Sequence, residues 1–346
     1  MRSRVISNLS HARRHHVPGL SLPFSLASPA RAINLCPMIE ISKLRKTFGA
    51  FIAVDDLSFR VERGEVLGFL GPNGAGKSTT MKMLTGFLRP DAGQVRIGDF
   101  DIITHQRAAQ KLIGYLPEGA PAWPEMSPRG FLNFIADIRQ LKGSEKTYAF
   151  DRAVAMTELH AVLDQPIETL SKGYRRRVGL AQAVLHDPPV LVMDEPTDGL
   201  DPNQKYGVRQ AISEMAAEKA IIISTHILEE VDAICSRAIV IDHGRMVGSG
   251  TPAQLAGQSI YAGAVSITVP SALRESVARE LENWADVARV DVVDRDSEVS
   301  ITIFPADADA DLLQRIKAQS SWQMRSIALE QGRLDDVFRR LTRRAS

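Results

Sequence analysis

The chain has few cysteines, no long apolar run and no excess of charge of either sign. Only two cysteines occur in 346 residues, Cys36 and Cys235, and they lie far apart without a nearby cluster of metal-binding side chains. A disulfide framework or a zinc site is therefore disfavoured, and a reducing compartment is favoured. The longest apolar runs, PPVLVM, AIIIS and AIVI, have the length of strands and fall far short of the roughly 20 residues of a membrane-spanning helix. We expect that the chain itself does not cross a membrane.

Charge is almost balanced, with 42 lysines and arginines against 41 aspartates and glutamates. A net charge of +1 provides no global attraction to nucleic acid or to a membrane surface, so any such contact would have to be local. Hydrophobic residues make up 44% and charged residues 24%, which are ordinary values for a globular protein. The length suffices for more than one domain, and we expect no nucleic-acid partner.

Residues 1–37 contain five arginines and three histidines but no acidic residue. Prolines interrupt the segment, and it has no helical or strand periodicity. Targeting peptides have such a composition. A disordered extension, or an over-long start with Met38 as the true first residue, is the simpler interpretation, and both remain open.

From Met38 onward, strand patterns alternate with helical patterns, which is typical of an α/β core. The predicted strands cover residues 39–44, 53–61, 65–71, 93–102, 189–194 and 220–225, and a hairpin over 238–250 turns at His243 and Gly244. Helices are predicted over 77–88 and through most of 127–163. After residue 258, strands at 264–269, 287–293 and 298–304 and helices from about Ser271 and Ala308 predict a small α+β domain over 259–346.

The sequence GPNGAGKST, residues 71–79, fits the phosphate-loop pattern G-x-x-x-x-G-K-[ST] and lies between a predicted strand and a predicted helix. Backbone N–H groups of such a loop converge on phosphate oxygens, and the helix N-terminus adds positive potential. We expect Lys77 to reach the β- and γ-phosphates, Ser78 to ligate Mg²⁺ and Thr79 to hold the α-phosphate. A glycine-rich turn without a ligand is the alternative. The predicted nucleotide-binding residues are Gly71, Pro72, Asn73, Gly74, Ala75, Gly76, Lys77, Ser78 and Thr79.

The apolar strand at 189–194 ends in two carboxylates, Asp194 and Glu195. Carboxylates at the C-terminal end of a parallel strand face the ligand site of an α/β sheet. Asp194 suits the Mg²⁺ shell and Glu195 suits a base that polarises the attacking water, with surface capping as the alternative. His226 follows the next apolar strand, where a lone histidine is more often a packing residue than a functional one.

Six motifs follow one another along the chain: GPNGAGKST, IGYLPE, LSKGY, VLVMDEP, GLDP and STH. Over about residues 38–250, this series resembles the ATP-binding subunit of an ABC transporter. The resemblance implies a P-loop NTPase core over 38–258, of class α/β, with an antiparallel β subdomain and a helical signature subdomain at about 119–186. The C-terminal α+β domain would follow this core.

The resemblance also implies roles for further residues. His226 would hold the γ-phosphate and the attacking water, which makes Glu195 and His226 the catalytic pair. Phe48 would stack on the adenine, with simple core packing as the alternative. Asp201, in GLDP, would lie on a loop at the dimer interface. The signature residues would bind the γ-phosphate held by a second cassette: Ser171, Lys172 and Gly173.

Two motifs depart from the usual pattern of the family. Glu118 stands where most cassettes have a glutamine that senses Mg²⁺, and a carboxylate is still a hard oxygen ligand. The predicted metal ligands are therefore Ser78, Glu118 and Asp194. The signature is LSKGY instead of LSGGQ. Both departures, and a C-terminal stretch like LEQGRLDDVFRRLT, resemble an exporter subgroup that serves gliding motility, nitrous-oxide-reductase maturation, or drug and lipid export.

The stretch LSKGYRRRVGL concentrates four cations at residues 172–177, which raises the question of a nucleic-acid patch. On a helix that begins after Ser171, the arginines lie on different faces, so they form no single basic stripe. Arg177 lies beside the apolar face and is expected to pair with a carboxylate. Lys172 would either strengthen closure on a phosphate or point to solvent.

We therefore predict an Mg-dependent ATPase that binds ATP and powers transport, with export as the expected direction. Two cassettes, as a homodimer or heterodimer, would close on two ATP molecules and drive separate integral membrane permease subunits. The expected location is peripheral, at the cytoplasmic face of the inner membrane. A soluble ABC ATPase acting on ribosomes or DNA is the alternative, but such proteins typically carry two cassettes or long coiled-coil insertions, and this sequence has neither.

Overall fold

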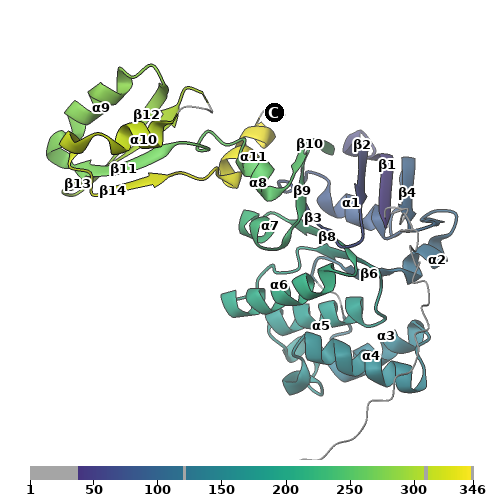
Figure 1. The fold of residues 1–346 in the computed structure, drawn as a ribbon. Coiled ribbons are helices and arrows are strands. Elements are labelled where there is room, and N and C mark those ends of the chain that lie inside the picture. The colour runs from purple at the N-terminus through teal and green to yellow at the C-terminus, as the bar shows by residue number, and fades with distance from the viewer. Residues whose placement is uncertain (1–37, 120–121, 308–310, 344–346) are drawn as a thin grey trace, which may run out of the picture. The chain divides into compact units, whose positions relative to one another are not determined.

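The computed structural model describes residues 38–119, 122–307 and 311–343 (Figure 1). The predictions made for residues 1–37, and the start of a helix at Ala308, lie outside the described residues. Among the helices in the described part of the chain, none combines the length and the apolar character of a membrane span.

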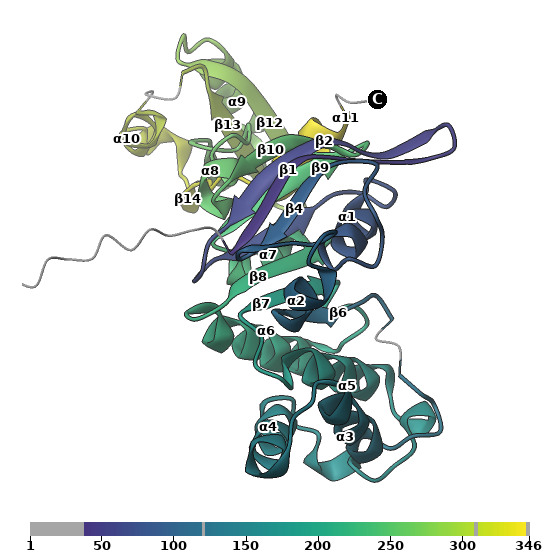
Figure 2. The same cartoon turned by 90° about the vertical axis from the view of Figure 1, so that its right-hand side faces the viewer.

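A six-stranded sheet forms the centre of the nucleotide-binding region, in the order β10-β9-β3-β8-β7-β6 (Figures 1 and 2). All neighbours are parallel except β9 and β10, which form the predicted hairpin. Every residue of strands β3, β8 and β7 is buried, because both faces of the sheet are covered. The strands are β3 (Val66–Leu70), β6 (Ile113–Leu116), β7 (Val190–Asp194), β8 (Ala220–Thr225), β9 (Arg237–Asp242) and β10 (Arg245–Gly250).

Alternate residues of the middle strands enter two separate hydrophobic cores. In β7, Leu191 and Met193 pack with the helical region, whereas Val190 and Val192 pack with the antiparallel strands and helix α1. This division follows from the two-residue repeat of a strand, which turns successive side chains to opposite faces. The sheet is thus the middle layer between two cores.

A second, antiparallel sheet covers one side, in the order β2-β1-β4-β5. Its strands are β1 (Ile39–Phe48), β2 (Phe51–Val61), β4 (Ala92–Ile97) and β5 (Phe100–Asp101). The prediction of one strand over 93–102 was wrong. Gly98 adopts a φ of 54°, and the turn that it forms splits this stretch into β4 and β5.

Helix α1 is shorter than predicted, whereas the prediction that most of 127–163 is helical is confirmed. Helix α1 ends at Leu84, not at residue 88, and Gly86 follows in the left-handed region. The stretch 127–163 contains two helices, because Gln140 and Gly143 both have positive φ and interrupt it. The helices are α1 (Lys77–Leu84), α2 (Gln106–Lys111), α3 (Pro128–Ile138), α4 (Gly143–Met156), α5 (Lys172–Val184), α6 (Pro202–Ala216), α7 (Leu228–Ile234) and α8 (Pro252–Ala256), with 3₁₀ turns at His160–Val162 and Ile167–Thr169.

The C-terminal region forms a third sheet, in the order β12-β13-β11-β14, with helices α9 and α10 on one face. The chain order βαββαβ together with this strand order is the ferredoxin-like arrangement. Alternate residues of β11 and β13 are buried, as the α+β prediction requires. The elements are β11 (Val265–Pro270), α9 (Arg274–Glu282), β12 (Val287–Arg295), β13 (Glu298–Pro305), α10 (Leu312–Lys317) and β14 (Ser326–Leu329), with 3₁₀ turns at Ser271–Leu273 and Ser320–Trp322.

The last helix, α11 (Leu334–Arg343), belongs to a different core from the sheet that precedes it. It contacts α8, β9 and β10, and Leu334 is part of the core that contains the helical region. Asp336 accepts hydrogen bonds from the Ser259 hydroxyl (2.9 Å) and from the Ile260 N–H (3.1 Å). The chain segments that enter and leave the C-terminal sheet are therefore joined at α11.

We expect Ile301→Ala to destabilise the C-terminal sheet by about 2–5 kcal/mol, because Ile301 is fully buried and its loss leaves a cavity. Val293→Ala is the matched control, since Val293 lies on neighbouring β12 and is 56% exposed. Urea unfolding followed by tryptophan fluorescence measures both, because Trp284 and Trp322 stack in this core. Equal effects of the two substitutions would contradict the burial pattern.

Candidate nucleotide site

The phosphate-binding loop links β3 to α1, as predicted, and it is tightly packed against its neighbours. A Cβ on Gly71 would lie 2.6 Å from the Ile241 carbonyl oxygen, and one on Gly76 would lie 2.4 Å from the Ala53 carbonyl oxygen. Gly76 also has a φ of 105° at the start of α1. Any other residue at Gly76 would meet both a clash and a strained backbone, so the tight packing of the loop requires glycine at this position.

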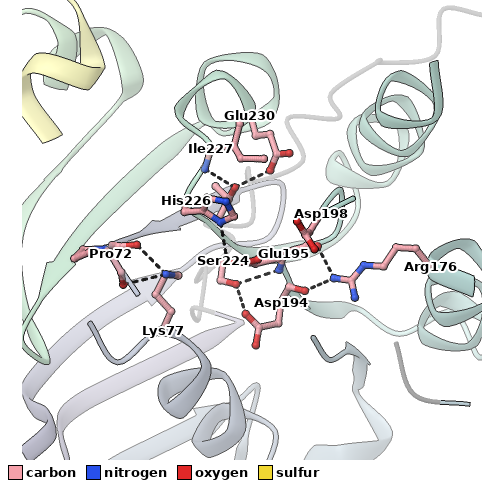
Figure 3. A network of polar contacts seen from close by, with 12 residues as sticks. Pro72, Lys77, Arg176, Asp194, Glu195, Asp198, Ser224, His226, Ile227 and Glu230 are labelled. Carbon is pink, nitrogen blue, oxygen red and sulfur yellow. Dashed lines mark hydrogen bonds and ion pairs between the residues drawn. The ribbon is translucent and has the colours of Figure 1, made fainter. Parts of the chain in front are cut away.

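Lys77 lies in the first turn of α1 with its ammonium turned back into this loop (Figure 3). The Nζ atom donates to the carbonyl oxygens of Gly71 (2.8 Å) and Pro72 (3.2 Å). Burial lowers the pKa of Lys77, while the carboxylates of Glu195 and Asp194 oppose this shift. A preorganised cation among backbone N–H groups is suited to bind phosphate.

Asp194 ends β7 and is 1% exposed. The hydroxyl of Ser224, from the neighbouring strand β8, donates to Asp194 Oδ1 and accepts the Glu195 N–H at 3.2 Å. Ser224 is fully buried and thus fixes both carboxylate residues from one side. Sequence reasoning missed Ser224. The available signal was a hydroxyl residue near the end of an otherwise apolar strand.

Glu195 lies at a turn with φ of 51°, which is unusual for a residue with a side chain. Its N–H donates to the Ser224 carbonyl at 3.0 Å. Its side-chain Oε1 lies 3.0 Å from Nδ1 of His226, so the two residues predicted as catalytic are brought together (Figure 3). Half of the His226 side chain remains exposed, which leaves its other ring nitrogen accessible.

The three predicted metal ligands line one cavity of about 340 Å³. Ser78, Glu118 and Asp194 come from α1, the end of β6 and the end of β7, and Tyr115 lies beside them. Burial, with the carboxylates of Asp194 and Glu118, raises the pKa of Tyr115 to about 12, so its hydroxyl stays neutral. One hydroxyl and two carboxylates are a donor set that fits Mg²⁺, which is commonly held by one or two carboxylates and by substrate phosphates.

Phe48 ends β1 and is 51% exposed, so the core-packing alternative was wrong. The Nζ atom of Lys46 lies 5.6 Å from the centre of its ring. A ring that is half exposed is available for stacking, and its role as an adenine platform stays a prediction.

The signature residues begin helix α5. The Ser171 hydroxyl caps the helix by accepting the Tyr174 N–H at 3.3 Å. A Cβ on Gly173 would lie 2.2 Å from Oε1 of Gln204, so α5 and α6 meet closely here. Lys172 does not simply point to solvent: its Nζ pairs with Asp198 at 2.8 Å.

Asp201 is the N-cap of α6 and accepts the Gln204 N–H at 3.0 Å. The loop before α6 contacts the beginning of the signature helix through the Asp198–Lys172 ion pair, and Gln204 of α6 lies against Gly173. The part of Asp201 in a dimer interface stays a prediction.

The basic cluster on α5 is divided among three environments. Arg175 is exposed, and Arg177 pairs with Glu158 at 2.6 Å, which confirms its predicted carboxylate partner. Arg176, to which sequence reasoning assigned no role, is only 5% exposed and points under the carboxylate strand. The three arginines therefore form no single basic face.

Comparison with known proteins shows the family to which the chain belongs. A family model described as ABC transporter matches residues 54–198. The Nod factor export ATP-binding protein I of Ralstonia nicotianae is 35% identical over 240 residues, 69% of this chain and 75% of that protein. The protein of the same name from Burkholderia lata is 32% identical over 311 residues, 88% of this chain and 97% of that one. A solved ATP-binding subunit of an ABC transporter superimposes with a TM-score of 0.60 at 28% identity, over 64% of this chain and 92% of that chain.

The chain belongs to the ABC transporter ATP-binding proteins. It is an ATPase subunit that works in transport, and the nucleotide of its family is ATP. Another solved cassette of a bacterial ABC transporter, 21% identical to this chain with a TM-score of 0.58, is described as dimeric. An alignment over 88% of this ATP-binding subunit has to reach strands of the C-terminal sheet, so the similarity to the Burkholderia relative extends beyond the nucleotide-binding region.

We expect Gly76→Ala to destabilise this ATP-binding subunit by more than about 2 kcal/mol, because strain at positive φ and the clash with Ala53 add up. Gly49→Ala is the control, since Gly49 also has positive φ but nothing lies within 4 Å of its added Cβ. That variant should lose only about 1 kcal/mol. Denaturant unfolding measures both, and a Gly76→Ala protein as stable as the control would contradict the packing of the loop.

Proposed function

We propose that two copies of this chain close on two molecules of Mg-ATP and that hydrolysis reopens them. The observation that carries the proposal is the contact between Glu195 and His226, at the edge of the sheet from which the loop that binds Lys77 also starts. Lys77 would bind the β- and γ-phosphates, and the glycine cradle would hold the remaining phosphate oxygens. Phe48 would stack on the adenine.

In the proposed hydrolysis, Glu195 accepts the proton of the attacking water. His226 holds the γ-phosphate and keeps the Glu195 carboxylate in place through its Nδ1 contact. Ser78, Asp194 and Glu118 would hold Mg²⁺, which neutralises the charge of the phosphates when it is bound. The Ser224 hydroxyl keeps the Asp194 carboxylate oriented.

The second half of each site would come from the other cassette. Residues 172–175 at the start of α5 include two cations and no acidic residue, although a helix N-terminus is already positive. Such a placement is stabilised by an incoming anion, and the γ-phosphate bound to the partner cassette supplies one. In the single chain, Asp198 balances Lys172, so closure would exchange this ion pair for contact with phosphate.

The proposed partners are integral membrane permease subunits, with the ATP-binding subunits bound at the cytoplasmic face of the inner membrane. Export is the proposed direction, since relatives that are about one-third identical carry export in their names. The alternative of a ribosome- or DNA-directed ATPase has no support among these relatives. Co-isolation with a polytopic membrane protein tests this part, and sedimentation with ribosomes instead would overturn it.

We expect Glu195→Gln to keep ATP binding, to lower kcat at least 100-fold and to accumulate an ATP-bound dimer, because the amide cannot accept the proton but fits the same space. Phosphate release and size-exclusion chromatography with ATP measure these effects. Near-normal hydrolysis by this variant would remove Glu195 as the base.

We expect Ser171→Arg to block dimerisation while the monomer still binds ATP, because a bulky cation would obstruct the surface that meets the partner's phosphate. Ultracentrifugation with ATP measures the dimer, and titration with a fluorescent nucleotide measures binding to the monomer. Loss of nucleotide affinity in the monomer would show that Ser171 does not act on the partner's site.

A further inference from the structure

Arg176 extends from the signature helix α5 to the side of the turn that follows β7, next to Asp194 (Figure 3). Its guanidinium donates to main-chain carbonyl oxygens from two chain segments. The Nη2 atom donates to the carbonyl oxygens of Asp194 and Glu195. The bonds to the carbonyl oxygens of Pro117 and Pro196 measure 2.9 and 3.3 Å. One side chain thus holds the Asp194–Pro196 turn and the residue before Glu118 at the same time.

These contacts require the chemistry of arginine. A guanidinium has five N–H donors in a planar fork, whereas lysine has three donors on one atom. Burial lowers the pKa of Arg176, and the carboxylates of Asp194, Asp198 and Glu195 oppose that shift. A buried charge persists only where it is paired and hydrogen-bonded, and four carbonyl oxygens with nearby carboxylates provide this.

The turn at Glu195 is the feature that most needs such support. A left-handed conformation costs a residue with a side chain about 1 kcal/mol or more, and it persists where the surroundings hold it. The Glu195 N–H is bound by the Ser224 carbonyl, and the Glu195 carbonyl is bound by Arg176. With both main-chain groups held, the direction of the carboxylate toward His226 is set.

We propose that Arg176 is a positioning residue for hydrolysis, which acts through Glu195 and also ties the Glu118 loop to the signature helix. It does not itself bind nucleotide. This inference rests on the proposed role of Glu195 as the base. Because Arg176 belongs to α5, the helix that would approach the partner's phosphate also holds the base of its own site.

The first test compares Arg176→Met and Arg176→Lys with Arg177→Met in the full-length chain. Arg177 is the matched control because it is the next residue on the same helix and pairs with Glu158 instead of the carboxylate turn. We expect Arg176→Met to lower kcat at least 10-fold while the Kd for ATP stays within about threefold. Arg176→Lys should fall between it and the wild type, and Arg177→Met should match the wild type. If the methionine variant does not fold, the lysine variant decides, with a kcat loss and unchanged Kd still required.

The second test separates positioning from a merely structural role. Arg176→Met combined with Glu195→Gln should still form the ATP-dependent dimer, because the nucleotide site and the outer face of α5 are intact. Loss of that dimer, a Kd that rises as much as kcat falls, or hydrolysis by Arg176→Met within threefold of the wild type would each overturn the proposal. If Glu195→Gln alone hydrolyses ATP normally, the proposed function fails as well. Normal hydrolysis by Arg176→Met with an inactive Glu195→Gln refutes only the role of Arg176.

Discussion

The candidate site depends on the shared edge at which the buried parallel strands end. The phosphate loop follows β3, the carboxylates end β7, and His226 follows β8, so parallel pairing brings together groups that lie up to 155 positions apart. Pairing of Asp194 with Ser224 in the β7–β8 register is what allows one hydroxyl to reach both Asp194 and Glu195. A shift of one residue in this register would turn these side chains to the opposite face.

The basic cluster on α5 shows that adjacent residues of one helix can lie in different environments and have different roles. A helix turns successive residues by about 100°, so the three arginines point in different directions. Arg175 lies in solvent, Arg176 lies in the interior, and Arg177 lies at the edge of the core. Burial separates their contributions. Arg177 forms a partly exposed pair, which contributes little to stability, whereas Arg176 donates hydrogen bonds to main-chain carbonyl groups of the catalytic turn and of the segment before Glu118.

Much of the site could be predicted because its motifs combine residue types and spacing that have a direct chemical purpose. The patterns identified the phosphate loop, both carboxylates, the mostly helical stretch 127–163 and the hairpin at His243 and Gly244. The misjudged elements were those without a strong local signal. Gly98 splits a continuous strand pattern, and Gly86 follows the early end of α1, through positive φ that composition alone does not reveal. Ser224 and Arg176 were missed because their partners lie on other strands and loops.

The sequence by itself determined the family of the chain, the order of its elements and the side chains that meet phosphate, since these depend on local patterns and on fixed motif spacing. Only the tertiary structure decided that Phe48 is exposed, that Lys172 pairs with Asp198, and that α11 packs with the core of the ATP-binding region. It also decided that the Arg176 guanidinium donates to the main-chain carbonyl of Glu195. These are contacts between distant segments, and their geometry exists only once the sheets and helices have packed.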